Sequence, residues 1–270
     1  MNIVVCVKQV PDTAAKIQDR VTDGRIDLEG VEWVTNPYDE YAVEEALRLK
    51  EAHGGQVTLI TLGPDRALQA LKDMLALGAD GGIHIKDPAL DNAGRRGVAK
   101  ALAAAIRKVG PSTGSGHHDV DMVWTGWKGV DEDHGLVPAY LAEELGWPHL
   151  SFVTKVDADP DAGRVVVEHE IEGGKEVLEA PLPAVFSAQK GLNEVRYASL
   201  KGIMAVKKKT IPEWTAADLG LDTSELQGPE VEFVHVDPPP ERQPGRILEG
   251  APEEAARELV RLLREEAKVI

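Results

Sequence analysis

The chain has 270 residues, of which 43% are hydrophobic and 28% charged, a composition typical of a globular protein with a large core. Its 46 acidic side chains exceed the 30 basic ones, and the formal net charge of −16 argues against a nucleic-acid-binding surface. The single cysteine excludes an internal disulfide and fits a reducing compartment, so we expect a cytoplasmic protein. The apolar run at residues 3–7 is too short to span a membrane, and no membrane insertion is predicted.

Apolar runs and amphipathic stretches alternate along the first 145 residues, which is the pattern of a parallel α/β sheet. Short β-branched runs predict strands at 3–7, 56–62, 82–86 and 121–125. Helical spacing of apolar residues predicts helices that begin near 37, 65, 92 and 136. The polar segment 16–34 carries an Asp23-Gly24 turn signal, so we expect a loop or short hairpin there. The predicted fold class is therefore α/β, a three-layer, Rossmann-like, mostly parallel sheet.

The sequence changes character after residue 150. Residues 165–178 predict an antiparallel β-hairpin insertion with a tight turn at Gly173-Gly174, followed by a last core strand at 183–186. Residues 212–270 show little periodicity until an apolar-faced helix at 252–267. We therefore predict an α/β domain over 1–211 and an extended C-terminal arm over 212–270 that packs on another protein.

The loop at 126–135 follows the fourth predicted strand, at the sheet edge where open α/β folds bind ligands. Its glycines permit close backbone approach, and the helix after it offers free amides and a positive dipole end, so we predict a phosphate site there. We expect its carboxylates, Asp131, Glu132 and Asp133, to cap that helix or to bind hydroxyl groups and water. The histidines at 117–118 have no acidic or cysteine partner at ligand spacing, and no metal site is predicted. The sequence contains no nucleophile–base arrangement, Walker loop or GxGxxG.

A basic island stands at residues 196–211 of this acidic chain. An apolar cluster directly precedes three lysines: Leu200, Ile203, Met204 and Val206, then Lys207, Lys208 and Lys209. One interpretation is an amphipathic connector whose apolar side belongs to the core, and composition alone favours it. The other is a docking surface, in which the apolar anchors supply desolvation energy and the lysines steer the encounter.

Four stretches resemble, in the same order, the electron transfer flavoprotein beta subunit (FixA) family. They are Val7-Lys-Gln-Val-Pro-Asp12, residues 36–51, Arg196-Tyr-Ala-Ser-Leu200 before the lysines, and the tail motifs at 218–222 and 237–239. The resemblance implies an adenine nucleotide alpha hydrolase-like sheet, with 1–211 as the nucleotide-binding domain and the arm packed on an alpha subunit. It implies AMP as a structural ligand in this chain, and FAD held mainly in the alpha subunit or shared with it.

The resemblance also implies roles for particular residues. It implies nucleotide contacts from Cys6, Val7, Lys8, Asn36, Leu62, Gly63, Gly126, Val130, Asp131, Glu132, Asp133, His134, Gly135, Leu136 and Val137. It implies a recognition loop at 196–211 that docks partners through Arg196, Tyr197, Leu200, Ile203, Met204, Lys207, Lys208 and Lys209, and an alpha-subunit contact at Glu170. Three of these residues keep a second interpretation: Cys6 as a small core residue, Asn36 as a helix N-cap, and Glu170 as a solvated carboxylate.

In function, the resemblance implies an electron carrier and not an enzyme. It would take electrons from acyl-CoA and related dehydrogenases, as in fatty acid oxidation, and pass them to a membrane quinone reductase. The 126–137 loop departs from the family pattern at 127–129 and 134–137, which concerns side-chain contacts to the phosphate. Electron-bifurcating members hold a second FAD in the AMP pocket, and the bulky Glu132 favours AMP here. The remaining alternative is a free-standing adenine-nucleotide-binding protein or hydrolase on the same fold.

Overall fold

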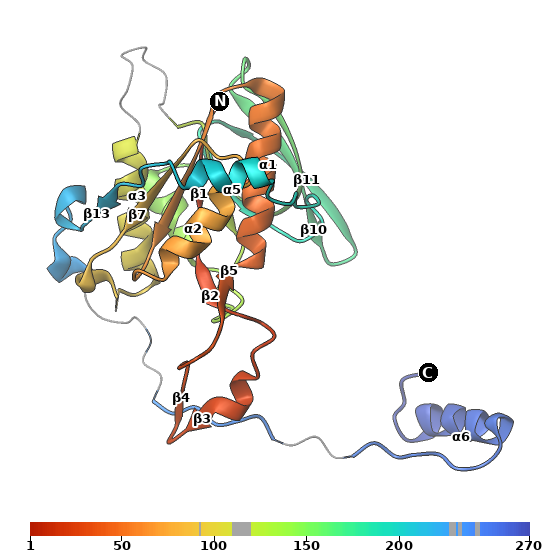
Figure 1. Ribbon diagram of the computed structural model, residues 1–270. Helices are drawn as coiled ribbons and strands as arrows, with labels where there is room; N and C mark the ends of the chain where they lie inside the picture. Colours follow the sequence, from red (N-terminus) through yellow and green to blue (C-terminus); the bar gives the residue numbers. More distant parts are fainter. Residues whose placement is uncertain (92, 110–119, 227–230, 232–233, 241–243) are drawn as a thin grey trace.

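The computed structural model describes residues 1–91, 93–109, 120–226, 231, 234–240 and 244–270 (Figure 1). Within these ranges nine strands form one sheet in the order β11-β10-β9-β12-β8-β1-β6-β7-β13. Their bounds are β1 Asn2–Cys6, β6 Gln56–Leu62, β7 Gly81–Ile85, β8 Met122–Gly126, β9 His149–Asp159, β10 Arg164–Ile171, β11 Gly174–Pro181, β12 Ala184–Ala188 and β13 Glu213–Trp214. Every neighbouring pair from β9 to β13 in this order is parallel, and β10 is antiparallel to both of its neighbours. The predicted α/β class with a mostly parallel sheet is confirmed.

Helices cover both faces of the sheet, which completes the predicted three layers. Helices α1 (Pro37–His53) and α2 (Ala67–Leu75) pack on one face, and α3 (Arg95–Val109) and α4 (Val137–Leu145) on the other. Two further helices, α5 (Leu200–Val206) and α6 (Pro252–Glu265), follow the last central strand. Short 3-10 turns lie at Ile17–Arg20, Pro88–Leu90, Ala217–Leu219 and Thr223–Glu225.

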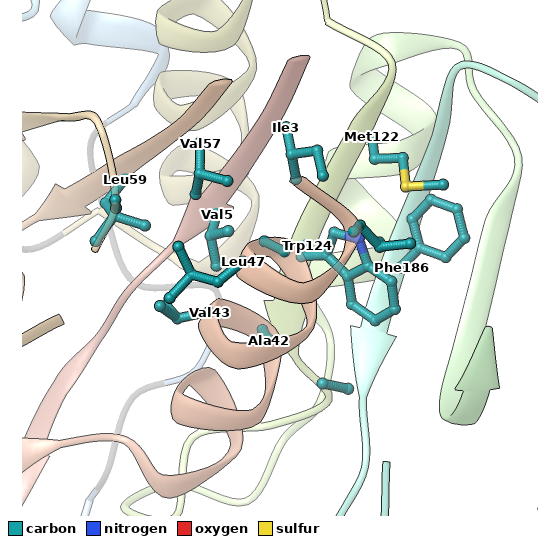
Figure 2. Packing of buried hydrophobic residues seen from close by; sticks show 14 of the residues in the cluster. Ile3, Val5, Ala42, Val43, Leu47, Val57, Leu59, Met122, Trp124 and Phe186 are labelled. Carbon is teal, nitrogen blue, oxygen red and sulfur yellow. The ribbon is translucent and has the colours of Figure 1, made fainter. Parts of the chain in front are cut away.

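Strand β1 is buried on both faces, as its continuous apolar run predicts. Successive side chains of a strand point to opposite faces, so Ile3 and Val5 enter the core under α1, whereas Val4 enters the core under α3 and α4. Figure 2 shows Val5 beside Leu47 of α1. The two cores hold the carboxyl ends of β1, β6 and β8 in fixed positions relative to one another.

The predicted hairpin extends the main sheet. Ile171 of β10 pairs with Gly174 of β11, so the two-residue turn is Glu172-Gly173 and not Gly173-Gly174. Gly173 takes the left-handed conformation that this turn requires, with φ of +80°. The sequence prediction missed β9, which joins the hairpin to β12 and of whose 11 residues only Leu150, Val153 and Ala158 are buried.

Between β1 and α1 the chain leaves the body of the fold (Figure 1). Strand β2 (Gln9–Pro11) pairs with β5 (Trp33–Thr35) at the base of this excursion. Farther out, β3 (Val21–Thr22) pairs with β4 (Arg25–Ile26) around the Asp23-Gly24 turn, so the predicted hairpin is confirmed. The arm touches its tip, where Val236 N donates to Gly24 O at 3.0 Å.

The first part of the arm belongs to the body. Strand β13 adds to the edge of the sheet beside β7, Ala216 is fully buried, and Leu226 enters the hydrophobic core under α3. The predicted boundary between residues 211 and 212 therefore lies ahead of a segment that packs on the sheet. Helix α6, by contrast, has no buried residue and stands away from the sheet (Figure 1). That this helix packs on another protein remains a prediction.

Candidate nucleotide site and docking surface

A cavity of about 710 Å³ opens at the carboxyl ends of β1, β6 and β8. The residues predicted to contact a nucleotide line it, with the exceptions of Val130 and Asp133: Cys6, Val7, Lys8, Asn36, Leu62, Gly63, Gly126, Asp131, Glu132, His134, Gly135, Leu136 and Val137. They belong to segments that are far apart in sequence, and the parallel sheet brings these segments to one edge. Their contacts with a nucleotide remain a prediction.

Asp39 is a buried carboxylate at the wall of this cavity, and sequence analysis did not identify it as a site residue. Its oxygens accept hydrogen bonds from Lys8 N at 2.6 Å, Gly126 N at 2.8 Å and Asn36 Nδ2 at 2.9 Å. Burial raises the pKa of Asp39 to about 7, although these donors act in the opposite direction. Asp39 thus ties the ends of β1 and β8 to the first turn of α1.

Asn36 occupies the N-cap position of α1, but its side chain makes no capping hydrogen bond. Besides Asp39, its Nδ2 binds Lys128 O at 2.9 Å, and its Oδ1 accepts from Val130 N at 3.2 Å. The expected side-chain cap is therefore wrong, because the amide group is used to hold the 126–135 loop against α1. Because the Val130 amide donates to Asn36 Oδ1, it is not free to bind a phosphate.

The glycines of the loop permit close packing of protein groups. A Cβ at position 126 would collide with Asp39 Oδ1 and would lie 2.6 Å from Tyr38 Cβ. A Cβ at position 129 would lie 2.5 Å from Asp131 Oδ1. Glycine is therefore required at position 126 by the protein's own contacts, whether or not a phosphate also approaches the backbone, whereas at position 129 the flexible side chains of Asp131 and Lys8 could move aside.

Each of the three consecutive carboxylates of the loop pairs with a cation. The pairs are Asp131 with Lys8 at 2.7 Å, Glu132 with Arg95 at 3.6 Å, and Asp133 with Lys128. Helix α4 begins after Leu136 without a side-chain cap, so the expected capping by these carboxylates is wrong. Sequence analysis could not predict the pairs with Lys8 and Arg95, because these cations come from distant segments. The acidic loop thereby neutralises basic residues around the cavity.

Two arginines and a tryptophan line the cavity without having been predicted. Arg95 opens α3, and its buried Nε has no hydrogen-bond partner among the described residues. Arg66 lies over the Trp33 ring, 3.8 Å from its centroid. All three depend on the tertiary placement of α2, α3 and β5, and no local motif signals them.

The aromatic side chain of Trp127 packs beside the loop and does not line the cavity. Its ring centroid lies 5.5 Å from that of Tyr38 and 5.0 Å from that of Phe152, and Lys128 Nζ lies 4.3 Å from it. The departure from the family pattern at position 127 thus supplies a packing anchor for the loop.

The predicted recognition loop contains a short helix, α5. Ser199 caps it, because its Oγ accepts from Gly202 N at 3.0 Å. Val206 is buried, whereas Leu200 is 83% exposed and Met204 is 56% exposed. Tyr197 and Ile203 are exposed as well. An apolar side that belonged to the core would not leave these side chains in solvent, so their exposure favours the docking interpretation over the connector.

Arg196 is held against α1 at the start of this segment. Its Nε donates to the buried carboxylate of Glu44 at 2.8 Å, and the guanidinium also pairs with Glu51. Hydrogen bonds from Arg196 and Arg48 lower the pKa of Glu44, although burial alone would raise it. In this structure Arg196 fixes the start of the 196–211 segment against α1, and its contact with a partner remains a prediction.

The other predicted contact residues lie at the surface. Lys207 and Lys208 are exposed, whereas Lys209 Nζ donates to Asp80 O at 2.6 Å. Glu170 is exposed on β10, and both of its interpretations, a contact with an alpha subunit and a solvated carboxylate, remain open.

The described residues contain no group of three or more histidine, cysteine, aspartate or glutamate side chains that could hold a metal ion. The histidines at 117 and 118 lie outside the described ranges. In the same part of the chain, the helices are all too short or too polar to cross a membrane.

The mostly parallel sheet with helices on both faces places the chain among the α/β proteins, and its cavity lies at the carboxyl edge, where such folds commonly bind ligands. Residues 23–219 match the electron transfer flavoprotein domain. The chain is 38% identical over 272 residues to the electron transfer flavoprotein subunit beta of Bacillus subtilis, with 100% of both chains covered. The subunit beta of Thermoanaerobacterium thermosaccharolyticum is 39% identical over 266 residues, which cover 97% of this chain and 98% of that one. Protein FixA of Azotobacter vinelandii is 36% identical over 229 residues, or 84% and 79% of the two chains.

The chain therefore belongs to the electron transfer flavoprotein beta subunit/FixA family, and the predicted family resemblance is confirmed. Membership carries a role in flavin-dependent electron transfer and implies a partner subunit of the same flavoprotein.

Proposed function

We propose that this chain is the beta subunit of a heterodimeric electron carrier that accepts electrons from acyl-CoA and related dehydrogenases. FAD is held mainly in the alpha subunit, and the electrons pass on to a membrane quinone reductase. The chain catalyses no bond change itself. It binds AMP, completes the flavin site and docks the dehydrogenase.

The cavity at the carboxyl edge of the sheet supports the AMP proposal. Its volume of about 710 Å³ falls within the roughly 300–1,000 Å³ of small-molecule sites. Glu132 lines the cavity with its side chain 3.6 Å from Arg95 Nη2, and a residue of this bulk at this position favours the smaller ligand. We therefore propose AMP in preference to a second FAD.

The single observation that carries the docking proposal is the unburied apolar side of α5. Leu200 and Met204 project from a helix whose end is fixed in the core by Val206, and exposed lysines follow directly. An apolar side chain held out by a rigid element can enter a pocket of a partner, while mobile cations steer the approach. A dehydrogenase with an apolar pocket inside an acidic rim would fit this surface.

The test is Leu200→Ala in the chain co-expressed with its partner subunit. Because Leu200 is 83% exposed, the substitution should leave thermal stability unchanged. It should weaken reduction of the bound flavin by an acyl-CoA dehydrogenase about tenfold, measured as kcat/KM, because an interface anchor is lost.

Val206→Ala is the matched control on the same helix. It removes a buried side chain, so it should lower thermal stability by an amount equivalent to about 1–3 kcal/mol and affect electron transfer less. Unchanged kcat/KM for Leu200→Ala would refute α5 as the docking element.

A further inference from the structure

We propose that Arg95 binds the phosphate group of an adenine nucleotide in the cavity, and that Glu132 forms an ion pair with Arg95 when no nucleotide is bound. The inference rests on the proposed nucleotide site, and in it Arg95 is the side chain that binds the anionic group of the ligand. Both AMP and FAD carry such a group, so the proposal names their shared chemistry.

The first observation is the incomplete pairing of Arg95. Its side chain is only 12% exposed and lines the cavity, yet its buried Nε has no hydrogen-bond partner in the described part of the chain. The carboxylate of Glu132 lies 3.6 Å from Nη2, which is longer than a hydrogen bond. A buried donor without an acceptor is unfavourable, and this arginine therefore retains capacity for an anion.

The second observation concerns the other cations that line the cavity. Lys8 makes a close ion pair with Asp131 at 2.7 Å, and Arg66 lies over the ring of Trp33, with its Cζ 3.8 Å from the centroid. Lys128 pairs with Asp133. Arg95 therefore combines a buried, unused donor with the longest of the three ion pairs that the acidic loop makes.

The third observation is the setting of the guanidinium group. The residues that begin α4, Leu136 and Val137, line the same cavity, and the positive end of a helix dipole favours an anion there. A guanidinium group presents a planar fork of N–H donors that matches two phosphate oxygens. A bound phosphate would give Arg95 Nε the acceptor that it lacks, and would displace the carboxylate of Glu132.

The experiment measures binding of AMP, FAD and adenosine by calorimetry to the complex of the full chain and its partner subunit, with the flavin site of the alpha subunit already filled with FAD and the cavity of this chain free of nucleotide. Arg95→Gln should weaken binding of AMP about tenfold to a hundredfold, because a charge-assisted contact is lost, and should leave binding of adenosine unchanged. Unchanged adenosine binding also shows that the pocket is still folded. Glu132→Gln should tighten AMP binding, because the phosphate no longer competes with a carboxylate for Arg95.

Arg107→Gln is the matched control, since it removes a guanidinium from the other end of α3, away from the cavity, and should bind AMP like the wild type. If wild-type protein binds AMP and Arg95→Gln binds it equally well, the inference is overturned while the proposed function stands. If FAD binds in the cavity but AMP does not, and Arg95→Gln lowers the affinity for FAD, then Arg95 binds the phosphate of a flavin nucleotide. In that case the AMP proposal alone fails. If the wild type binds neither nucleotide, the proposed site and this inference fail together.

Discussion

At the scale of single residues, the cavity is shaped by charges whose partners are remote in sequence. Asp39 lies in the first turn of α1, where the sequence indicates only a favourable interaction with the helix dipole. In the fold it becomes a buried acceptor for the backbone of Lys8 and Gly126. The same holds for Arg95, whose neighbours in sequence give no sign that it faces a cavity.

Asp39 should give the protein a measurable pH dependence of stability. The folded protein releases the Asp39 proton near pH 7, whereas the unfolded chain releases it near the ordinary pKa of 3.8. The Asp39 contribution to the free energy of unfolding should therefore fall by about 1.4 kcal/mol for each pH unit as the pH rises from about 4 to 7. Above pH 7 this contribution should stay level.

Urea denaturation of wild type and Asp39→Asn at several pH values isolates this term, because other titrating groups are common to both proteins. The difference in unfolding free energy between the two should change steadily between pH 4 and 7. A difference that is constant across this range would show that Asp39 titrates alike in the folded and unfolded chain.

At the scale of elements, continuous apolar runs predicted the central strands, which are buried on both faces, and apolar residues at helical spacing predicted the four covering helices. Elements that depend on neighbours were missed. Strand β9 buries only Leu150, Val153 and Ala158 among its 11 residues, at irregular spacing, and β13 is a two-residue edge strand that exists only by pairing with β7. The hairpin turn was placed one residue late because the two consecutive glycines both fit a turn, and only the register with β10 distinguishes them.

We expect helix α6 to pack on a partner protein. It has no buried residue, and Leu259 and Val260 are each nearly half exposed. Removal of residues 252–270 should leave the melting temperature of the isolated chain unchanged and weaken association with the partner subunit about tenfold or more, since apolar burial at the interface is lost.

Size-exclusion chromatography over a concentration series measures that association. A truncation that begins at residue 213 is the control, and it should lower the melting temperature because it removes β13 and the buried Leu226. If the shorter truncation assembled as tightly as the full chain, α6 would not be an interface element.

At the scale of the whole molecule, the protein combines a packed sheet with two surfaces that its own fold does not cover. The sheet places a cavity at its carboxyl edge, and α5 and α6 expose apolar side chains, which we propose contact other proteins. The position of the cavity could be predicted, because parallel strands bring their ends together wherever they occur in the sequence. The ion pairs around the cavity could not, since they depend on how α3 and the acidic loop meet in space.

The most direct test of the central claim is the cofactor content of the protein purified with its co-expressed partner subunit. After denaturation, the released nucleotides are separated and quantified by chromatography. We predict one FAD and one AMP per heterodimer, with the AMP bound in the cavity of this chain. Two FAD and no AMP would contradict the AMP assignment and make the cavity a flavin site, and a chain that purifies alone without flavin would contradict the carrier function itself.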